Sequence, residues 1–502
     1  MPALRSRVAH PDGLATVVGS TTVADRPKAG SQAVCRAPRE RLDLLCDRGS
    51  FEPIRSTVRS PWLGRRAADG DGVVVGLGRI DGRPVACFAQ DSRFLGGSLG
   101  VSQADSIDRV MELARRSRMP VVGLIESAGA RMQEGTAALG GFGRIFRRNV
   151  ELSGLVPQIS IVGGVAAGGA CYSPALTDFT VMTKEASMFL TGPAVVREVA
   201  GEVVSPEQLG GPRVHERNGV CDLVAADDRG AADLARRLLG YLPQHAGGAL
   251  PQTLSVEPDL ADAGAGVPVS SRRVYDVRTV IHGVVDAGSL LEVGERWARS
   301  ILTGLARCDG RPVGVIANQP RYLGGVLDAA SAQKAARFVE TCDAFGLPLI
   351  VLVDTPGFMP GRQQEAAGVI RFGATLLRAF AAASVPKLTV VLRKAYGGAF
   401  ITMNSKDLGA DLVFAWRDAE IGVMGANAAV GIINRRDWEA AGDPASRRAA
   451  LAAAYANQHL GAAAAASGGF VDEVIEPRET RLRLVWALAM LRDGGAAPSG
   501  WH

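Results

Sequence analysis

Apolar positions along the chain alternate between short continuous runs and longer stretches at helical spacing. Residues 121–126 and 155–165 are short apolar runs, which indicate buried strands. Ile107, Val110 and Met111 recur at the spacing of a helix and predict one over residues 102–117. Because strands and helices follow one another in turn, the pattern predicts an α/β fold with largely buried strands.

Weaker patterns predict further helices and strands. A helix is expected over residues 39–45, and paired strands over 72–90 around the Asp81-Gly82 turn. Beyond residue 170 the first half of the chain is predicted to be largely helical, ending with a helix over 231–242.

The chain also repeats itself at an offset of about 228 residues. The matching segments are Asp81-Gly82-Arg83-Pro84 with Asp309-Gly310-Arg311-Pro312, Phe94-Leu95-Gly96-Gly97 with Tyr322-Leu323-Gly324-Gly325, Glu126-Ser127 with Asp354-Thr355, Gly129 with Gly357, and Gly168-Gly169 with Gly397-Gly398. So long a period predicts two copies of a whole domain.

Composition places the domain boundaries. Residues 247–271 are rich in Pro, Gly, Ala and Ser, which predicts a linker. The expected organisation is a flexible N-terminal arm over 1–37, a first domain over 38–246, that linker, and a second domain over 272–502.

Charge and length narrow the class of protein. The 502 residues are 47% hydrophobic, enough for large cores, and the net charge of +5 includes no basic tract. We therefore expect neither a disordered chain nor a nucleic-acid partner. No apolar run reaches membrane-spanning length, so no membrane partner is expected either. The seven cysteines form no Cys-x-x-Cys pair, which is typical of reduced thiols in a cytoplasmic protein.

Glycine turns are the first candidates for chemistry. A helix that begins at Gly168-Gly169, or at its repeat Gly397-Gly398, would direct free main-chain N–H groups toward an anion. A tight turn with nothing bound is the alternative. Gly425-Ala426 suggests a third such turn, and a close-packed helix crossing accounts for it equally well.

Charged side chains give weaker evidence for a binding or catalytic site than the glycine turns do. Arg131 could hold a phosphate or pair with Glu134, and a surface ion pair is the commoner fate of such an arginine. The six histidines have no metal-ligand spacing, so no metal site is expected. Lys394 beside Tyr396 could serve as a base, although anchoring a strand end is the default for such a lysine.

At these residues the chain closely resembles the carboxyltransferase (β) subunits of biotin-dependent acyl-CoA carboxylases, nearest to the propionyl-CoA carboxylase branch. The resemblance runs from about Arg39 to Leu491. The segments that carry it are Gln90-Asp91, Gly96 to Gly100, Ser127 to Gly135, Tyr172 to Phe179, Thr191-Gly192-Pro193, Ala317 to Pro320, Pro356 to Gly361, Arg393 to Ala399 and Val423 to Ala426.

The resemblance implies two crotonase-like (ClpP/crotonase superfamily) domains and a homo-hexamer. It implies an active site between the first domain of one subunit and the second domain of another, with acyl-CoA on the first and carboxybiotin on the second. Biotin would be carried by a partner, the biotin carboxylase/biotin carrier (α) subunit, and this chain would bind no metal or nucleotide. No side-chain base is then needed, because biotin takes the α-proton of the thioester before the enolate attacks CO₂.

Residue roles follow from the resemblance by position. Gly168 and Gly169 would stabilise the thioester enolate, and Gly425 and Ala426 the biotin ureido oxygen. The remaining residues are assigned to binding: on the substrate side Gly96, Gly97, Gly129, Ala130, Arg131 and Asn427, and on the biotin side Tyr396, Gly397 and Gly398.

The chain also departs from the family pattern. The departures are Ala128 for a glycine, Ser92-Arg93 for Phe-Thr, Ala428 for a glycine, and Arg55 and Arg59 where an arginine-histidine pair is usual. The leading hypothesis is carboxylation of a short acyl-CoA, acetyl or propionyl, supplying malonyl or methylmalonyl units. The alternatives are a decarboxylase of a malonyl-type thioester and a non-catalytic scaffold.

Overall fold

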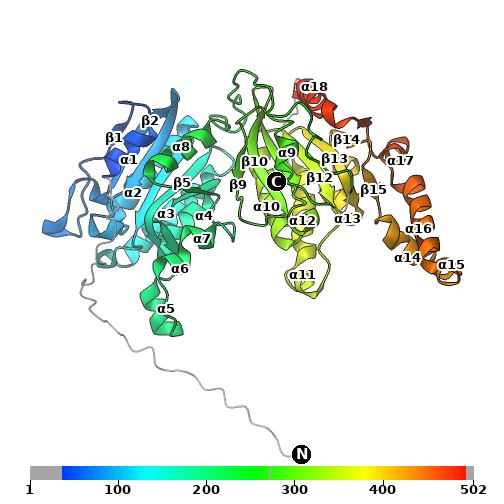
Figure 1. The fold of residues 1–502 in the computed structure, drawn as a ribbon. Coiled ribbons are helices and arrows are strands. Elements are labelled where there is room, and N and C mark those ends of the chain that lie inside the picture. The colour runs from blue at the N-terminus through cyan, green and yellow to red at the C-terminus, as the bar shows by residue number, and fades with distance from the viewer. Residues whose placement is uncertain (1–36, 271–272, 493–502) are drawn as a thin grey trace, which may run out of the picture. The chain divides into compact units, whose positions relative to one another are not determined.

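The computed structural model describes residues 37–270 and 273–492. Each half of the chain builds one eight-stranded sheet, and the predicted α/β class is confirmed (Figure 1). The predicted N-terminal arm, apart from Ala37, lies outside the described residues.

The first half contains strands β1 to β8 in the order β1-β2-β3-β4-β5-β6-β8, with β7 paired to β5. The strands are β1 (Glu52–Ile54), β2 (Val73–Ile80), β3 (Arg83–Gln90), β4 (Val121–Ser127), β5 (Gln158–Ala167), β6 (Phe179–Thr183), β7 (Ser187–Phe189) and β8 (Leu223–Ala225). The α-helices are α1 (Pro38–Leu45), α2 (Val101–Ser117), α3 (Thr136–Leu152), α4 (Tyr172–Leu176), α5 (Pro193–Ala200), α6 (Pro206–Gly210), α7 (Pro212–His215) and α8 (Asp228–Leu239).

The second half repeats this order as β9-β10-β11-β12-β13-β14-β16, with β15 paired to β13. The strands are β9 (Leu291–Val293), β10 (Ile301–Cys308), β11 (Arg311–Asn318), β12 (Leu349–Thr355), β13 (Lys387–Tyr396), β14 (Leu412–Trp416), β15 (Glu420–Gly422) and β16 (Glu473–Ile475). The α-helices are α9 (Arg278–Ile281), α10 (Ala329–Ala344), α11 (Arg362–Ala366), α12 (Val369–Ala382), α13 (Gly397–Thr402), α14 (Ala426–Ile433), α15 (Arg435–Glu439), α16 (Pro444–Tyr455), α17 (Ala462–Ser467) and α18 (Thr480–Arg492).

Local sequence signals account for the best-predicted elements. Both Asp-Gly hairpins form, with φ of +51° and +57° at Asp81 and Asp309 and of +77° and +73° at the glycines that follow. Two consecutive positive φ values define the type I′ turn that suits twisted strands. Beyond each hairpin the strands pair in parallel, and β4 and β12 are buried at every residue, as sheets covered on both faces require.

The prediction that helices predominate after residue 170 holds for α4 to α8, but β6, β7 and β8 also lie there and were not predicted. These strands have five, three and three residues, too few for periodicity to identify. The helix expected over 231–242 begins earlier, at Asp228, where the side chain of Asp227 accepts a hydrogen bond from the Gly230 amide.

An apolar core continues from the first half into the second. Leu238 and Leu242 belong to it, as do Leu291 and Ile301 beyond the predicted linker. The linker itself packs against the second half, where Ala263 is 2% exposed and the Thr253 amide donates to the Gly310 carbonyl. None of the helices in the described ranges combines the length and the apolar character needed to cross a bilayer.

Candidate active site

The first candidate turn begins where β5 ends. A 3-10 turn over Gly168–Cys171 follows Ala167 directly and leads into α4. Gly168 has a φ of +58°, which favours glycine, and a Cβ on Gly169 would lie 2.9 Å from the ring of Phe142. The first N–H groups of a helical turn lack intrahelical partners, so this half-buried turn offers donors to an anion.

The duplicated turn has the same backbone at Gly397-Gly398. Gly397 has a φ of +59° and α13 begins there. The surroundings differ, since a Cβ on Gly398 would lie 3.8 Å from the ring of Phe358, an ordinary contact. The predicted repeat of the turn is therefore confirmed. The second glycine has more free space around it at Gly398 than at Gly169.

Gly425 and Ala426 lie at the start of α14, where Gly425 is the residue before the first helical position. The Ala428 and Ala429 amides donate to the Gly425 carbonyl, which leaves the amides of Ala426 and Asn427 at the open end of the helix. A Cβ on Gly425 would lie 3.4 Å from the ring of Tyr396.

The structure brings the residues predicted for the biotin side together with this helix start. The Tyr396 hydroxyl donates to the carboxylate of Glu420, and the position of a Cβ on Gly397 lies 3.0 Å from the Val423 carbonyl oxygen. Burial and the hydrogen bond to Glu420 raise the pKa of Tyr396. Tyr396 therefore stays protonated and holds β15 beside the loop that leads into α14.

Gly96, Gly97, Gly129 and Ala130, predicted for the substrate side, also converge, whereas Asn427 lies in α14 of the second half. The Ala128 amide donates to the Gly96 carbonyl at 2.9 Å, and the Leu99 amide to the Gly129 carbonyl at 2.8 Å. Gly97 cannot carry a side chain, since its Cβ would lie 2.0 Å from the Glu126 carbonyl oxygen. The Gly129 Cβ position is 3.3 Å from the carbonyl oxygen of Ala167, directly before Gly168. This loop therefore lies against the first turn.

Arg131 pairs with Glu134 as one of the predicted alternatives had it, but the expected location of that pair on the surface is wrong. Its guanidinium is fully buried and bonds the Asp71 carboxylate at 2.7 Å and that of Glu134 at 2.8 Å. Both partners are also buried, so the side chain is closed to a ligand and a substrate contact would have to come from the main chain. Gly100 makes this packing possible, because a Cβ there would lie 2.2 Å from an Arg131 nitrogen.

The pKa values of the two carboxylates that bond Arg131, Asp71 and Glu134, are shifted in opposite directions. Burial raises the pKa of Asp71, although Arg131 opposes that effect. Burial acts in the same direction on Glu134, but hydrogen bonds from the Val101 amide, Ser60 and Arg131 outweigh it and lower its pKa. Sequence reasoning missed Asp71 and Ser60, and the run Asp69-Gly70-Asp71-Gly72 gave no periodic signal that could have pointed to them.

The departures at Ala128, Ala428, Ser92 and Arg93 fit without strain, whereas Arg55 has a φ of +56°, in the left-handed region that favours glycine. Ala128 lies outside the left-handed region, so its methyl group needs no special backbone. Ala428 is a helical position of α14, where alanine is favoured over glycine. The Ser92 hydroxyl donates to the carboxylate of Glu126 at 2.7 Å, and Arg93 forms an ion pair with Asp91.

Lys394 projects from β13 with its amine 3.7 Å from the carboxylate of Asp354, which also bonds Arg393 at 2.8 Å. This agrees with a lysine that anchors a strand end. Across the part of the chain that the structure describes, no cluster of His, Cys, Asp and Glu is placed to hold a metal ion.

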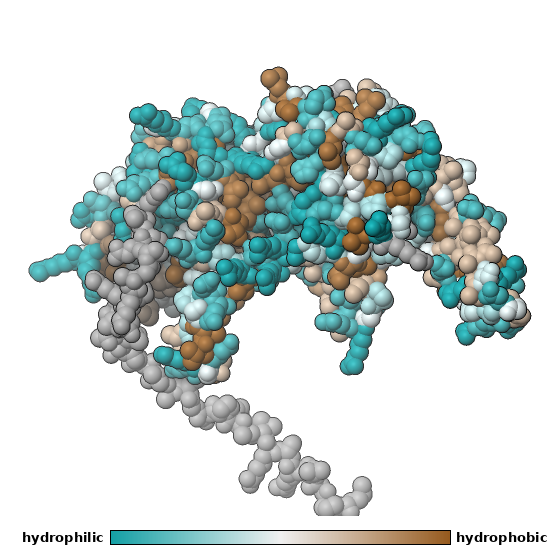
Figure 2. Space-filling model, in the orientation of Figure 1, coloured by the Kyte–Doolittle hydropathy of each residue, from teal (hydrophilic) through white to brown (hydrophobic). Residues whose placement is uncertain are grey.

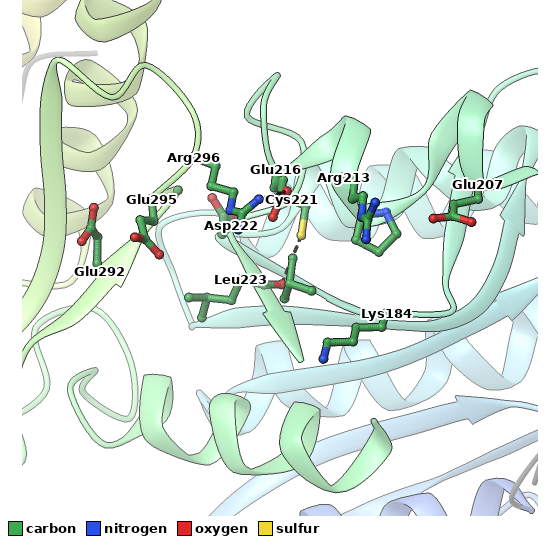
Figure 3. Close-up of a pocket in the computed structure, with 13 residues that line it drawn as sticks. Lys184, Glu207, Arg213, Glu216, Cys221, Asp222, Leu223, Glu292, Glu295 and Arg296 are labelled. Atoms are coloured by element: carbon green, nitrogen blue, oxygen red, sulfur yellow. Dashed lines mark hydrogen bonds and ion pairs between the residues drawn. The ribbon is translucent and has the colours of Figure 1, made fainter. Parts of the chain in front are cut away.

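A cavity of about 540 Å³ lies where the two halves meet (Figure 3). Asp222 and Leu223 line it from the first half, and Glu292 and Glu295 from the second. Its lining carries charges of both signs and includes none of the glycine turns or their neighbours described above. The candidate active site is therefore not this cavity.

Comparison with known proteins agrees with this geometry. The carboxyl transferase domain family matches residues 33–498, and the chain belongs to that family. It is 47% identical over 467 residues to the carboxyltransferase subunit of propionyl-CoA carboxylase from Haloferax mediterranei, covering 91% of this chain and 90% of that protein. It is 44% identical over 463 residues to methylmalonyl-CoA decarboxylase subunit alpha from Propionigenium modestum, covering 90% and 89%.

A solved structure extends the likeness to three dimensions. The hexameric transcarboxylase 12S, crystallised with methylmalonyl-coenzyme A and methylmalonic acid bound, superposes with a TM-score of 0.88 at 44% identity. The alignment covers 93% of this chain and 91% of that one. The predicted crotonase-like architecture is confirmed.

Proposed function

We propose that the protein is the carboxyltransferase subunit of a biotin-dependent acyl-CoA carboxylase. It moves a carboxyl group from carboxybiotin on a partner protein to the α-carbon of acetyl- or propionyl-CoA. The observation that carries the proposal is a pair of helix-start turns, Gly168-Gly169 and Gly425-Ala426, in a chain of this family. Both turns offer main-chain donors, and in the proposed reaction biotin rather than a side chain accepts the proton.

The two turns act on different oxygens. The Gly168 and Gly169 amides bind the thioester oxygen as it becomes an enolate, and donors fixed before the reaction stabilise that charge without reorganisation. The Gly425 and Ala426 amides hold the ureido oxygen of biotin, and Tyr396 packs beneath Gly425 to position them. Carboxybiotin supplies the carboxyl group and the proton acceptor when it is bound.

A homo-hexamer and a biotin carboxylase/biotin carrier partner belong to this proposal. Support for assembly comes from apolar side chains gathered near the tip of α5 (Figure 2), where Val199 is 80% exposed and Val203 81%. Apolar surface of this kind is typical of contacts between subunits. A cytoplasmic location suits the described cysteines, which are buried and free of disulfides.

Reconstitution tests the function directly. The protein is combined with a biotinylated α subunit, ATP and bicarbonate, and carboxylation is measured across acetyl-, propionyl- and butyryl-CoA. We expect ATP-dependent carboxylation, fastest with acetyl- or propionyl-CoA. A second candidate, decarboxylation of a malonyl-type thioester, is favoured by the relative from Propionigenium modestum. Loss of CO₂ from methylmalonyl-CoA without ATP, and no carboxylation, would support it instead.

Complementation is expected between chains that lack different turns. A Gly169→Val chain and an Ala426→Trp chain should each be inactive alone, because each loses one set of donors. Hexamers that contain both should recover part of the activity, since some interfaces would pair two intact turns. Absence of recovery in verified mixed hexamers would mean that one chain builds its whole site.

Chain-length preference is expected to change at Asn427, whose exposed side chain follows the Gly425-Ala426 turn. Asn427→Ile should shift the ratio of kcat/KM toward butyryl-CoA, because each additional buried methylene is worth about 0.8 kcal/mol. The measurement compares the three acyl-CoA substrates in the reconstituted enzyme. An unchanged ratio in a folded, active variant would place chain-length selection elsewhere, with Ser92 and Arg93 examined next.

A further inference from the structure

The Gly425-Ala426 turn, assigned above to biotin, begins a helix with few buried residues. Helices α14, α15 and α16 lie next to one another beyond β15 (Figure 1). Within α14 only Ala429 and Val430 are buried, and none of the described side chains caps its first turn. Contacts from the two neighbouring helices therefore matter for how the first turn of α14 is held.

One side chain of α16 reaches the first turn of α14. Arg448 donates from Nη2 to the main-chain carbonyl of Asn427 at 3.2 Å. Gly431 leaves space for this contact, since a Cβ there would lie 3.4 Å from the same nitrogen. The Arg448 guanidinium also lies over the ring of Trp438 on α15, 5.1 Å from the ring centroid. The head group of Arg448 is thus held by both neighbouring helices.

The positive charge of Arg448 is not neutralised by the part of the chain that the structure describes. Nearby arginines have acidic partners, since Arg447 pairs with Asp437 at 2.9 Å and Arg435 with Glu439 at 2.8 Å. Arg448 takes part in no ion pair with any described residue, and α14 itself contains no charged residue. Arg448 is therefore a lone positive charge beside the first turn of α14.

A positive charge at this end of a helix is unfavourable for the helix alone. The N-terminus of a helix carries partial positive charge, which repels a nearby cation and attracts a bound anion. The charge of Arg448 becomes favourable once an anion lies at the amides of Ala426 and Asn427, which are open at the start of α14. The amides and the guanidinium then stabilise the same negative charge.

We propose that Arg448 is a positioning residue for the biotin side of the active site. It fixes the first turn of α14 through the Asn427 carbonyl and supplies a positive charge near the Gly425-Ala426 turn. The inference rests on the proposed function, because it assumes carboxybiotin as the carboxyl donor. When CO₂ leaves carboxybiotin, the negative charge of the carboxylate passes to the ureido oxygen, and Arg448 favours that charge.

Carboxyl transfer from methylmalonyl-CoA to free biotin tests this role, because it can be followed with the protein alone and each substrate has its own KM. Arg448→Met keeps the length of the side chain and removes its charge. It should lower kcat/KM for biotin about tenfold or more, while KM for methylmalonyl-CoA stays within about twofold of wild type. Arg448→Lys keeps the charge and should recover most of the loss. The control is Arg447→Met, which removes a half-exposed ion pair on the same helix and should leave both constants unchanged.

Thermal unfolding and the size of the assembly show whether each variant is folded. If Arg448→Met does not assemble, Trp438→Leu takes its place, because it keeps the charge and removes the ring under the guanidinium. That variant should lower kcat/KM for biotin about threefold, with KM for methylmalonyl-CoA unchanged.

Three results would overturn the proposal: unchanged constants in a folded Arg448→Met protein, equal losses with both substrates, or no recovery in Arg448→Lys. The last two would make Arg448 a structural contact only. A wild-type protein that transfers no carboxyl group to biotin, and none in the reconstituted complex, would instead refute the proposed function.

Discussion

Gly169→Val is expected to lower kcat by about two or more orders of magnitude, the scale of losing one oxyanion donor at roughly 3 kcal/mol. A Cβ at Gly169 would already lie 2.9 Å from the ring of Phe142, and valine adds two methyl groups. Phe142 stacks on Phe146, so the ring has little freedom to move away. The turn must shift instead, which redirects its amides. Steady-state carboxylation by the reconstituted enzyme is the measurement.

The matched control is Gly143→Ala, on the neighbouring helix α3. A Cβ on Gly143 meets no atom within 4 Å, so this change should leave kcat unaltered and stabilise the helix slightly. Both variants must elute at the size of the wild-type assembly. Wild-type turnover by a correctly assembled Gly169→Val enzyme would contradict the assignment of this turn.

Arg131→Ala is expected to lower the free energy of unfolding by about 3–5 kcal/mol, because it leaves buried carboxylates without their cation. Asp71 and Glu134 are both inaccessible to solvent in the structure. Thermal or denaturant unfolding measures the loss. The control is Arg115→Ala, which removes an ion pair from a half-exposed arginine and should cost at most about 1 kcal/mol.

The loss in unfolding free energy caused by Arg131→Ala should also depend on pH. Burial already raises the pKa of Asp71, and removing Arg131 removes the charge that opposes this effect. A carboxyl whose folded pKa is raised binds more protons in the folded state, so the variant should regain stability as pH falls through that pKa. An Arg131→Ala midpoint equal to wild type at neutral pH would show that the ion pair contributes nothing to folding.

Features set by neighbouring residues could be predicted from the sequence. The Asp-Gly dipeptides specified both hairpins, because a type I′ turn depends on two adjacent residues. The offset repeat revealed the duplicated half, and the strand-end glycines located Gly168 and Gly397 on positive-φ turns. The roles of these turns came from the family resemblance and stay predictions, as do the domain boundaries at residues 246 and 272.

Features that depend on contacts between residues far apart in the chain could not be predicted from the sequence. Arg131 resembled a surface residue because two of the groups that bury it, Asp71 and Ser98, lie 60 and 33 positions earlier in the chain. The short strands β6 to β8 hold too few residues for a period, and they form because β5 offers an edge to β6 and β7, and β6 offers one to β8. The core shared by the halves likewise joins Leu238 to Leu291 across the linker.

The sequence by itself therefore determined the α/β class, the duplication and the positions of the glycine turns, since each depends on local pattern or on repetition. Only the tertiary structure decided which charges are buried, which glycines have room for a side chain, and which parts of the two halves share a core. Those properties depend on packing between residues far apart in the chain, and the local pattern of residues does not specify which distant residues pack together.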